Sequence, residues 1–255
     1  MHSIYVGETE IRLHGNIGPF VTEDRFGPFL NARPVAGVFD LSFEFENGSG
    51  EGVGQHFEYE RHDLHFVAPS TVNATAYFDG GLAAFLAALE LALYVAVSAS
   101  EGLLVHASVG TVGTGAWLMP GPSGTGKSTA ALGGFERVLS DERVLLLKGE
   151  RGITAWGTPF WSDGRQMPLD AGSAQLVGIA RLRKADAPMV EMAGRAEMLT
   201  WLMGSIVAYG SHAARVNDIL DLVADVIQSV DCVKLSFPRE GKWAPLMLNP
   251  IGLAS

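Results

Sequence analysis

Hydrophobic and polar residues alternate between Met1 and Phe78 with the period of β-strands. The clearest segment is 38–46, where phenylalanine or leucine at positions 39, 41, 43 and 45 alternates with aspartate, serine or glutamate. Such alternation gives a strand one apolar and one polar face, and it predicts a half-buried antiparallel strand. The glycine-rich segment 47–52 predicts a turn that leads to a returning strand at 55–60. Further strands are expected at 64–67 and 72–78.

A long apolar run at positions 82–97 is rich in alanine and leucine, which favour helix. The run is interrupted by Glu90, and it is shorter than the stretch of about 20 apolar residues that a bilayer span needs. We therefore expect a buried helix and no membrane partner. Because Asp79-Gly80-Gly81 interrupts the strand pattern, the sequence predicts a small β-rich N-terminal domain over residues 1–79 and a second domain over residues 80–255.

In the second domain, short apolar runs alternate with helical segments, which predicts an α/β fold beside an α+β N-terminal part. A charged turn is expected at 183–188, after a buried strand. The helix expected at 215–230 carries an apolar stripe of Val216, Ile219, Leu220, Val223, Ile227 and Val230. Strands are expected at 103–105, 116–119, 137–142, 143–148, 174–182 and 232–237, and helices from 127 and at 197–203 and 215–230.

Composition narrows the function classes. With 47% hydrophobic and 18% charged residues, the 255-residue chain is of ordinary globular composition. A net charge of −10 argues against nucleic acid as a partner, because that affinity comes from neutralising phosphates. The single cysteine, Cys232, excludes an internal disulfide framework and a cysteine zinc cluster. Together with the lack of a signal-peptide pattern at the start, this favours a reducing compartment, the cytoplasm.

One stretch has the pattern G-x-x-x-x-G-K-[ST] of a phosphate-binding loop. The small residues of this pattern let backbone N–H groups surround a phosphate, Lys127 would neutralise the outer phosphates, and Ser128 would place its hydroxyl on Mg²⁺. A buried strand precedes the loop and a helix follows it, and Gly133-Gly134 limits that helix to about two turns. The alternative is a glycine turn without a ligand. The predicted phosphate-binding residues are Gly121, Pro122, Ser123, Gly124, Thr125, Gly126, Lys127, Ser128 and Thr129.

Two acids follow the loop at the end of an apolar run. Asp141 and Glu142 come after the short helix expected from 127 and at the end of the apolar run that follows it. A neighbouring strand would bring them beside the loop there. Phosphoryl transfer needs a metal at the phosphate oxygens and a group that positions or deprotonates the nucleophile, and either acid could serve. The alternative is a turn with two exposed acids. By itself His106, at the end of an earlier strand, would be read as a core residue.

These features together resemble the catalytic core of the HPr kinase/phosphorylase family, especially its small bacterial HPr-kinase-like members. His106 precedes the loop, a strand leads into 120–129, and Leu139-Ser140-Asp141-Glu142 follows. The segments 157–160 and 230–237, with a tryptophan soon after the second, also resemble that group. The resemblance covers residues 80–245 and adds little for the N-terminal part. Glu142 stands where the family usually has aspartate, and the glycine-rich signature of the phosphorylase reaction is not found.

The resemblance implies a P-loop kinase core of the HPr kinase/PEP carboxykinase type that uses ATP and Mg²⁺. Such a kinase transfers the γ-phosphoryl group to a hydroxyl, usually of serine, on a peptide or small protein. It places the general base on Asp141, the catalytic cation on Lys127, and a histidine near the phosphates or the base on His106. Ser128, Asp141 and Glu142 would hold the metal.

Other functions stay open from the sequence. A kinase of a small-molecule hydroxyl is a close variant, and a nucleotide-binding regulatory or scaffold module with little turnover is a different class. An ATPase motor or switch GTPase is less favoured, because the chain has no Asn-Lys-x-Asp guanine motif and no arginine-finger signature. The oligomeric state, including a homo-oligomer, is not specified by the sequence.

Overall fold

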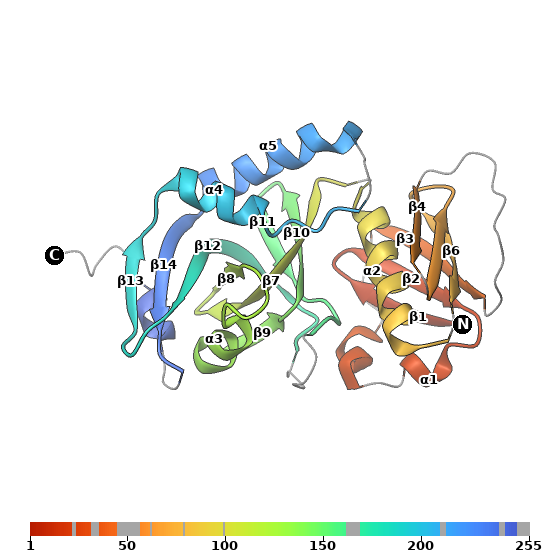
Figure 1. The fold of residues 1–255 in the computed structure, drawn as a ribbon, viewed down its shortest axis with the longest axis horizontal. Helices are drawn as coiled ribbons and strands as arrows, with labels where there is room; N and C mark the ends of the chain where they lie inside the picture. The colour runs from red at the N-terminus through yellow and green to blue at the C-terminus, as the bar shows by residue number, and fades with distance from the viewer. Residues whose placement is uncertain are drawn as a thin grey trace. The chain divides into compact units, whose positions relative to one another are not determined.

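The chain divides into two compact units, each with its own sheet. The computed structural model describes residues 1–21, 24–31, 36–44, 57–61, 63–78, 80–98, 100–161, 169–209, 213–239 and 243–248. One unit comprises residues 1–101 with 208–213, and the other residues 102–207 with 214–255. Figure 1 shows both as mixed α/β structures with few helices. The division follows Glu101 rather than the predicted residue 79.

The first unit is built on a six-stranded sheet in the order β1-β2-β3-β6-β5-β4. Its strands are β1 (His2–Val6), β2 (Thr9–His14), β3 (Gly37–Glu44), β4 (Phe57–Arg61), β5 (Leu64–Ala68) and β6 (Asn73–Phe78), and its helices are α1 (Gly18–Val21), the 3₁₀ turn η1 (Asp24–Phe29) and α2 (Leu82–Ser98).

The predicted hairpin in this unit is wrong. The alternation is real, since Phe39, Leu41 and Phe43 are buried on one face of β3. However, β3 lies between β2 and β6 and runs parallel to both, while β4 pairs with β5 at the edge of the sheet. Period-two alternation shows which face of a strand is buried, but it does not identify the neighbouring strand. The expected turn at 47–52 and the start of the expected return strand lie outside the described residues.

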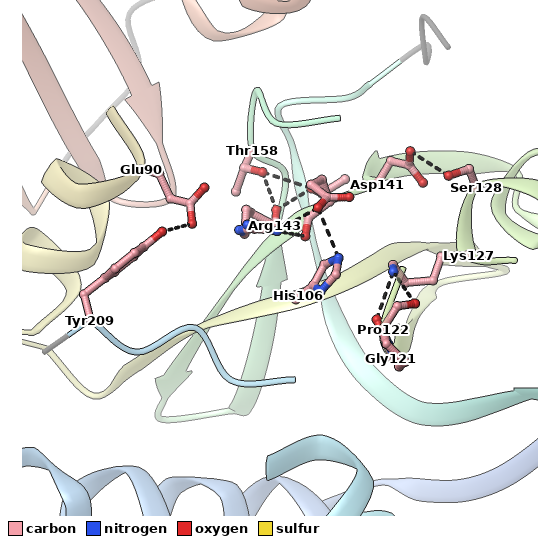
Figure 2. Close-up of polar contacts among 12 residues, drawn as sticks. Glu90, His106, Gly121, Pro122, Lys127, Ser128, Asp141, Arg143, Thr158 and Tyr209 are labelled. Atoms are coloured by element: carbon pink, nitrogen blue, oxygen red, sulfur yellow. Dashed lines mark hydrogen bonds and ion pairs between the residues drawn. The ribbon is translucent and has the colours of Figure 1, made fainter. Parts of the chain in front are cut away.

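Helix α2 belongs to this unit, which is why the division comes later than predicted. Its Phe85 lies with ring centroids 5.1 Å from those of both Phe20 and Phe43, so the helix covers the apolar face of the sheet. Glu90, the one charged residue of the run, is buried and accepts a hydrogen bond from the hydroxyl of Tyr209 (Figure 2). A polar partner for Glu90 accounts for a carboxyl group inside an apolar helix.

The second unit has an eight-stranded mixed sheet in the order β11-β10-β7-β8-β12-β14-β13, with β9 paired to β7. Strand β11 also pairs with β12, so β10, β7, β8, β12 and β11 form a closed ring of pairings. The strands are β7 (Gly102–Val112), β8 (Gly115–Pro120), β9 (Arg137–Ser140), β10 (Arg143–Gly149), β11 (Gly152–Trp156), β12 (Ser173–Lys184), β13 (Met189–Met192) and β14 (Asp231–Phe237). The helical segments are α3 (Lys127–Gly134), α4 (Arg195–Met203), α5 (Ala213–Ser229) and η2 (Ala244–Met247).

The alternation of β7 separates the core from the phosphate loop. Val105, Ala107 and Val109 point into the main hydrophobic core, to which α4 and α5 also contribute buried side chains. Ser108 points the other way, with its hydroxyl 3.5 Å from the backbone carbonyl of Lys127 at the start of α3. Since successive residues of a strand face opposite sides, α3 lies on the face of β7 away from this core.

The early end of α3 has a steric cause. The predicted stop at Gly133-Gly134 is confirmed, since the helix ends at Gly134. A Cβ on Gly134 would lie 2.0 Å from Cε2 of Trp243. The indole is 1% exposed and donates from Nε1 to the carbonyl of Ala130 at 3.0 Å. Trp243 therefore packs across the end of the helix where only glycine leaves room.

The predicted stripe of α5 is only partly buried. Val223 and Ile227 belong to the core, but Val216 and Leu220, nearer the start of the helix, are 52% and 44% exposed. Among the described residues no helix is both long and apolar enough to cross a membrane.

Candidate functional site

The predicted phosphate loop, residues 121–126, connects β8 to α3. The predicted order of strand, glycine loop and helix is confirmed, with Lys127 as the first helical residue. Gly124 and Gly126 have φ values of 83° and 99°, a region that is costly for residues with a Cβ. At Gly126 a Cβ would also lie 2.7 Å from Cζ of Phe237. The shape of the loop therefore depends on its glycines.

The residues predicted to bind phosphates lie partly at the tip of this loop and partly in the first turn of α3. Pro122, Ser123 and Gly124 form its exposed tip, and the hydroxyl of Thr125 donates to the carbonyl of Pro122 at 2.9 Å. Ser128 and Thr129 lie in the first turn of α3, with their side chains half-buried. The nine residues predicted to bind phosphates thus form one continuous structure.

Lys127 closes the loop on itself. Its Nζ donates to the carbonyls of Gly121 at 2.9 Å and Pro122 at 3.2 Å (Figure 2). The residue is only 6% exposed, and burial lowers the pKa of its ammonium group, although the nearby charges of Glu142 and Asp141 partly offset this effect. The ammonium is thus held inside the loop by carbonyl oxygens that phosphate oxygens could replace.

Asp141 lies at the first turn of α3. Its Oδ2 accepts a hydrogen bond from the Ser128 hydroxyl at 3.0 Å (Figure 2), and the residue is fully buried. A serine hydroxyl beside a carboxylate suits Mg²⁺, which binds through one or two protein oxygens while substrate phosphates and water supply the rest. The described residues contain no group of three His, Cys, Asp or Glu side chains that could hold a metal on their own. Ser128 and Asp141 therefore fit a metal that arrives with a nucleotide.

A break in one strand places the two acids. Arg143 of β10 pairs with His106 of β7, and Ser140 of β9 pairs with Val109. Two residues separate the paired positions on both strands, so Ser140 and Arg143 share one register along β7 and the acids occupy the interruption. The rest of β9 is shifted by one residue at a bulge, with Val138 opposite Gly110. On its other side β7 pairs with the end of β8, Ala107 being opposite Pro120. The acids are thereby aligned across β7 with the start of the phosphate loop.

Two buried hydroxyls hold this interruption in place. The side chains of Ser140 and Thr158 lie 2.9 Å from each other, and both contact the carbonyl oxygen of Arg143. Both residues are fully buried. The backbone approaches closely here, since a Cβ on Gly157 would lie 2.0 Å from the carbonyl oxygen of Asp170. The segment 157–160 therefore supports the acid-bearing turn, a role that its sequence alone did not indicate.

Glu142 faces His106 rather than Ser128. Its Oε1 lies 3.1 Å from Nε2 of His106 and 2.9 Å from Nη1 of Arg143. The contact with His106 has ion-pair distance but not hydrogen-bond alignment. Burial alone would raise the pKa of Glu142, but His106, Arg143 and Lys127 outweigh it, so the pKa lies below its usual range. Glu142 is thus held ionised beside the loop, and the structure does not place it in the predicted metal set with Ser128.

Sequence reasoning missed three residues that bear on the site. Trp201 of α4 donates from its indole to the carbonyl of Pro120 at 2.8 Å, immediately before the loop. Arg143 is paired with Glu142. Lys184 donates to the carbonyl of Gly124 at 2.9 Å, although its segment was predicted to be a charged turn. A cation after an apolar run was the only sequence signal for Lys184.

A scan against protein-family models and a search of curated proteins give no match for this chain. The functional argument therefore depends on the geometry of the site and on the resemblance in its motifs.

Proposed function

We propose that this protein is an ATP- and Mg²⁺-dependent kinase that phosphorylates a hydroxyl, in the first instance serine, of a peptide or small protein. The observation that carries the proposal is the Ser128–Asp141 pair at the mouth of a phosphate loop whose lysine is buried. A nucleotide-binding scaffold would need the loop. It would need no base for an acceptor hydroxyl, which is the role that the resemblance implies for Asp141.

The roles of the residues follow from the contacts. Lys127 would exchange the carbonyls of Gly121 and Pro122 for β- and γ-phosphate oxygens. Ser128 and Asp141 would hold Mg²⁺, which supplies neutralisation of the charge on the phosphate oxygens. His106 and Glu142, which contact each other, would be further polar groups beside the loop.

In the proposed reaction the acceptor oxygen forms a bond to the γ-phosphorus while the bond from that phosphorus to the ADP oxygen breaks. The proton of the acceptor hydroxyl passes to the carboxylate of Asp141, as the resemblance implies. Such positioned proton transfer contributes about 10²- to 10⁴-fold in rate. Positioning and charge neutralisation supply the rest.

The experiment is a phosphotransfer assay with γ-labelled ATP and, as acceptors, the proteins and peptides encoded beside this one. Asp141→Asn should lower the transfer rate at saturating Mg²⁺ and nucleotide by at least 100-fold, because the lost proton acceptor acts mainly in the transition state. Nucleotide affinity measured without Mg²⁺ should change by less than about threefold, since Asp141 would contact the metal rather than the nucleotide. Asp225→Asn is the matched control, since Asp225 is an exposed aspartate paired with Lys148.

Two results would overturn the proposal. If the wild type binds nucleotide but phosphorylates no acceptor, the scaffold alternative is favoured, and equal transfer by Asp141→Asn would remove Asp141 as the base. If the wild type hydrolyses ATP rapidly without any acceptor, the chain is an ATPase. Phosphorylation of a free hydroxyl compound in place of a peptide acceptor would identify the protein as a small-molecule kinase.

A further inference from the structure

Three parallel strands end at the phosphate loop. β8 runs parallel to β12, and β12 runs parallel to β14. β8 leads into the loop, so the ends of β12 at Lys184 and of β14 at Phe237 lie at the same edge of the sheet. In sheets of this kind ligands bind beyond the carboxyl ends of the strands. Residues at these two ends are therefore candidates for contacts to the nucleotide beyond the loop motif.

Lys184 reaches the loop from this edge. Its Nζ donates to the carbonyl oxygen of Gly124 at 2.9 Å, and its Cε lies 3.5 Å from the position that a Cβ on Gly126 would occupy. Phe237, its neighbour in the register, contacts the same glycine position. Around Gly124 itself a Cβ would meet no atom within 4 Å. The ammonium group thus lies beside the open tip of the loop.

Three other cations of β12 and β14 are paired. Arg181 and Lys234 both contact the carboxylate of Glu197. Arg183 donates from Nε to Ser236 and lies 3.9 Å from Glu191. Lys184 has no carboxylate within ion-pair distance in the part of the chain that the structure describes, and its known partner is a carbonyl. A cation without a counter-ion next to a phosphate loop is suited to an anionic ligand.

We propose that Lys184 is a second phosphate-binding cation, which leaves the Gly124 carbonyl for the outermost phosphate of a bound nucleoside triphosphate. Lys127 is bonded instead to the carbonyls of Gly121 and Pro122, nearer the start of the loop. The inference rests on the proposed nucleotide site, and it adds that Lys184 makes the site prefer a triphosphate over a diphosphate. It is independent of the acceptor.

The test is calorimetric titration of the full-length protein with Mg²⁺ and either the non-hydrolysable analogue AMPPNP or ADP, so that no turnover is needed. Lys184→Gln should raise the Kd for AMPPNP about tenfold and that for ADP less than threefold. Lys184→Arg keeps the charge and should stay within about threefold of the wild type. The loss should shrink in about 0.5 M salt, because the cation is exposed.

Arg183→Gln is the matched control. It removes one positive charge from the adjacent position of the same strand, but its side chain bonds to Ser236 rather than to the loop. Its affinities should stay within twofold of the wild type. Thermal unfolding of each variant should match that of the wild type, since both side chains are exposed.

The remaining outcomes separate a failure of the Lys184 inference from a failure of the proposed function. Equal weakening of AMPPNP and ADP by Lys184→Gln would mean that the lysine only braces the loop, and equal losses in both variants would mean a general field effect. No binding of either nucleotide by the wild type would overturn the nucleotide site as well. Wild-type binding without transfer to any hydroxyl would overturn the kinase proposal alone and leave the Lys184 result interpretable.

Discussion

Trp243 packs against Gly134 so closely that the end of α3 has no room for a side chain at position 134. Replacement of Gly134 by alanine in a helix would ordinarily stabilise it by about 1 kcal/mol. Here the new Cβ would lie 2.0 Å from Cε2 of a fully packed indole, and overpacking of this kind costs about 1–3 kcal/mol. Displacement of the indole would also weaken its hydrogen bond to Ala130, which contributes about 1 kcal/mol. We therefore expect Gly134→Ala to destabilise the protein by about 2 kcal/mol.

Urea unfolding followed by circular dichroism measures this difference in the free energy of unfolding. Gly204→Ala is the control, because it is the same change at the end of α4, where a Cβ would lie an ordinary 3.6 Å from the nearest atom. It should be neutral within about 0.5 kcal/mol. In the Gly134→Ala/Trp243→Phe double variant the combined loss should be smaller than the sum of the single losses, because the residues are in contact. If Gly134→Ala is as stable as the wild type, Trp243 does not set the end of α3.

Three further predictions concern the site. Gly126→Ala should weaken AMPPNP binding at least tenfold, because position 126 has a positive φ and the new Cβ would meet Phe237. An unchanged affinity in calorimetry would refute a loop shape that depends on this glycine. Thr158→Val, which removes one of two hydroxyls at the carbonyl of Arg143, should lower stability by about 1–2 kcal/mol and transfer rate by about tenfold. An effect on neither would contradict its bracing role. Glu142→Gln should lower the free energy of unfolding at pH 7. Because the pKa of Glu142 in the folded wild type is lowered from 4.5, the difference in stability between wild type and variant should persist at pH 5 and vanish as the pH falls through the lowered pKa. If denaturant titrations show that this difference in stability grows below pH 4, the pKa of Glu142 is not lowered by folding.

The strand, glycine loop and helix of the predicted phosphate loop could be predicted because their signals are local. Its consensus residues, the apolar run of β8 and the paired glycines at the end of α3 all lie between Gly115 and Gly134. The placement of Asp141 at the end of an apolar run also gave its position after β9. In each case a short sequence pattern fixes the backbone without a contribution from distant parts of the chain.

The errors come from contacts between distant segments. The sequence of β3 shows which side is buried, but its parallel neighbours are determined by the whole sheet. Glycines at 80 and 81 looked like a domain boundary, whereas the packing of Phe85 keeps α2 with the first sheet. Lys184 was assigned to a turn because charged residues favour exposed loops, but β14 extends β12 to that residue by pairing. Such pairings cannot be read from periodicity alone.

The two-residue link between Ser140 and Arg143 has a consequence for how this site can change. Substitution at positions 141 and 142 alters chemistry while leaving the pairings on either side intact. An insertion or deletion of one residue between Ser140 and Arg143 would displace one of the two pairings that flank the acids, Ser140 with Val109 or Arg143 with His106. In sequence variants of this protein, exchanges at these two positions should therefore leave the strand pairings in place while altering the proposed chemistry, whereas a change in the number of residues between Ser140 and Arg143 should disturb the pairings themselves.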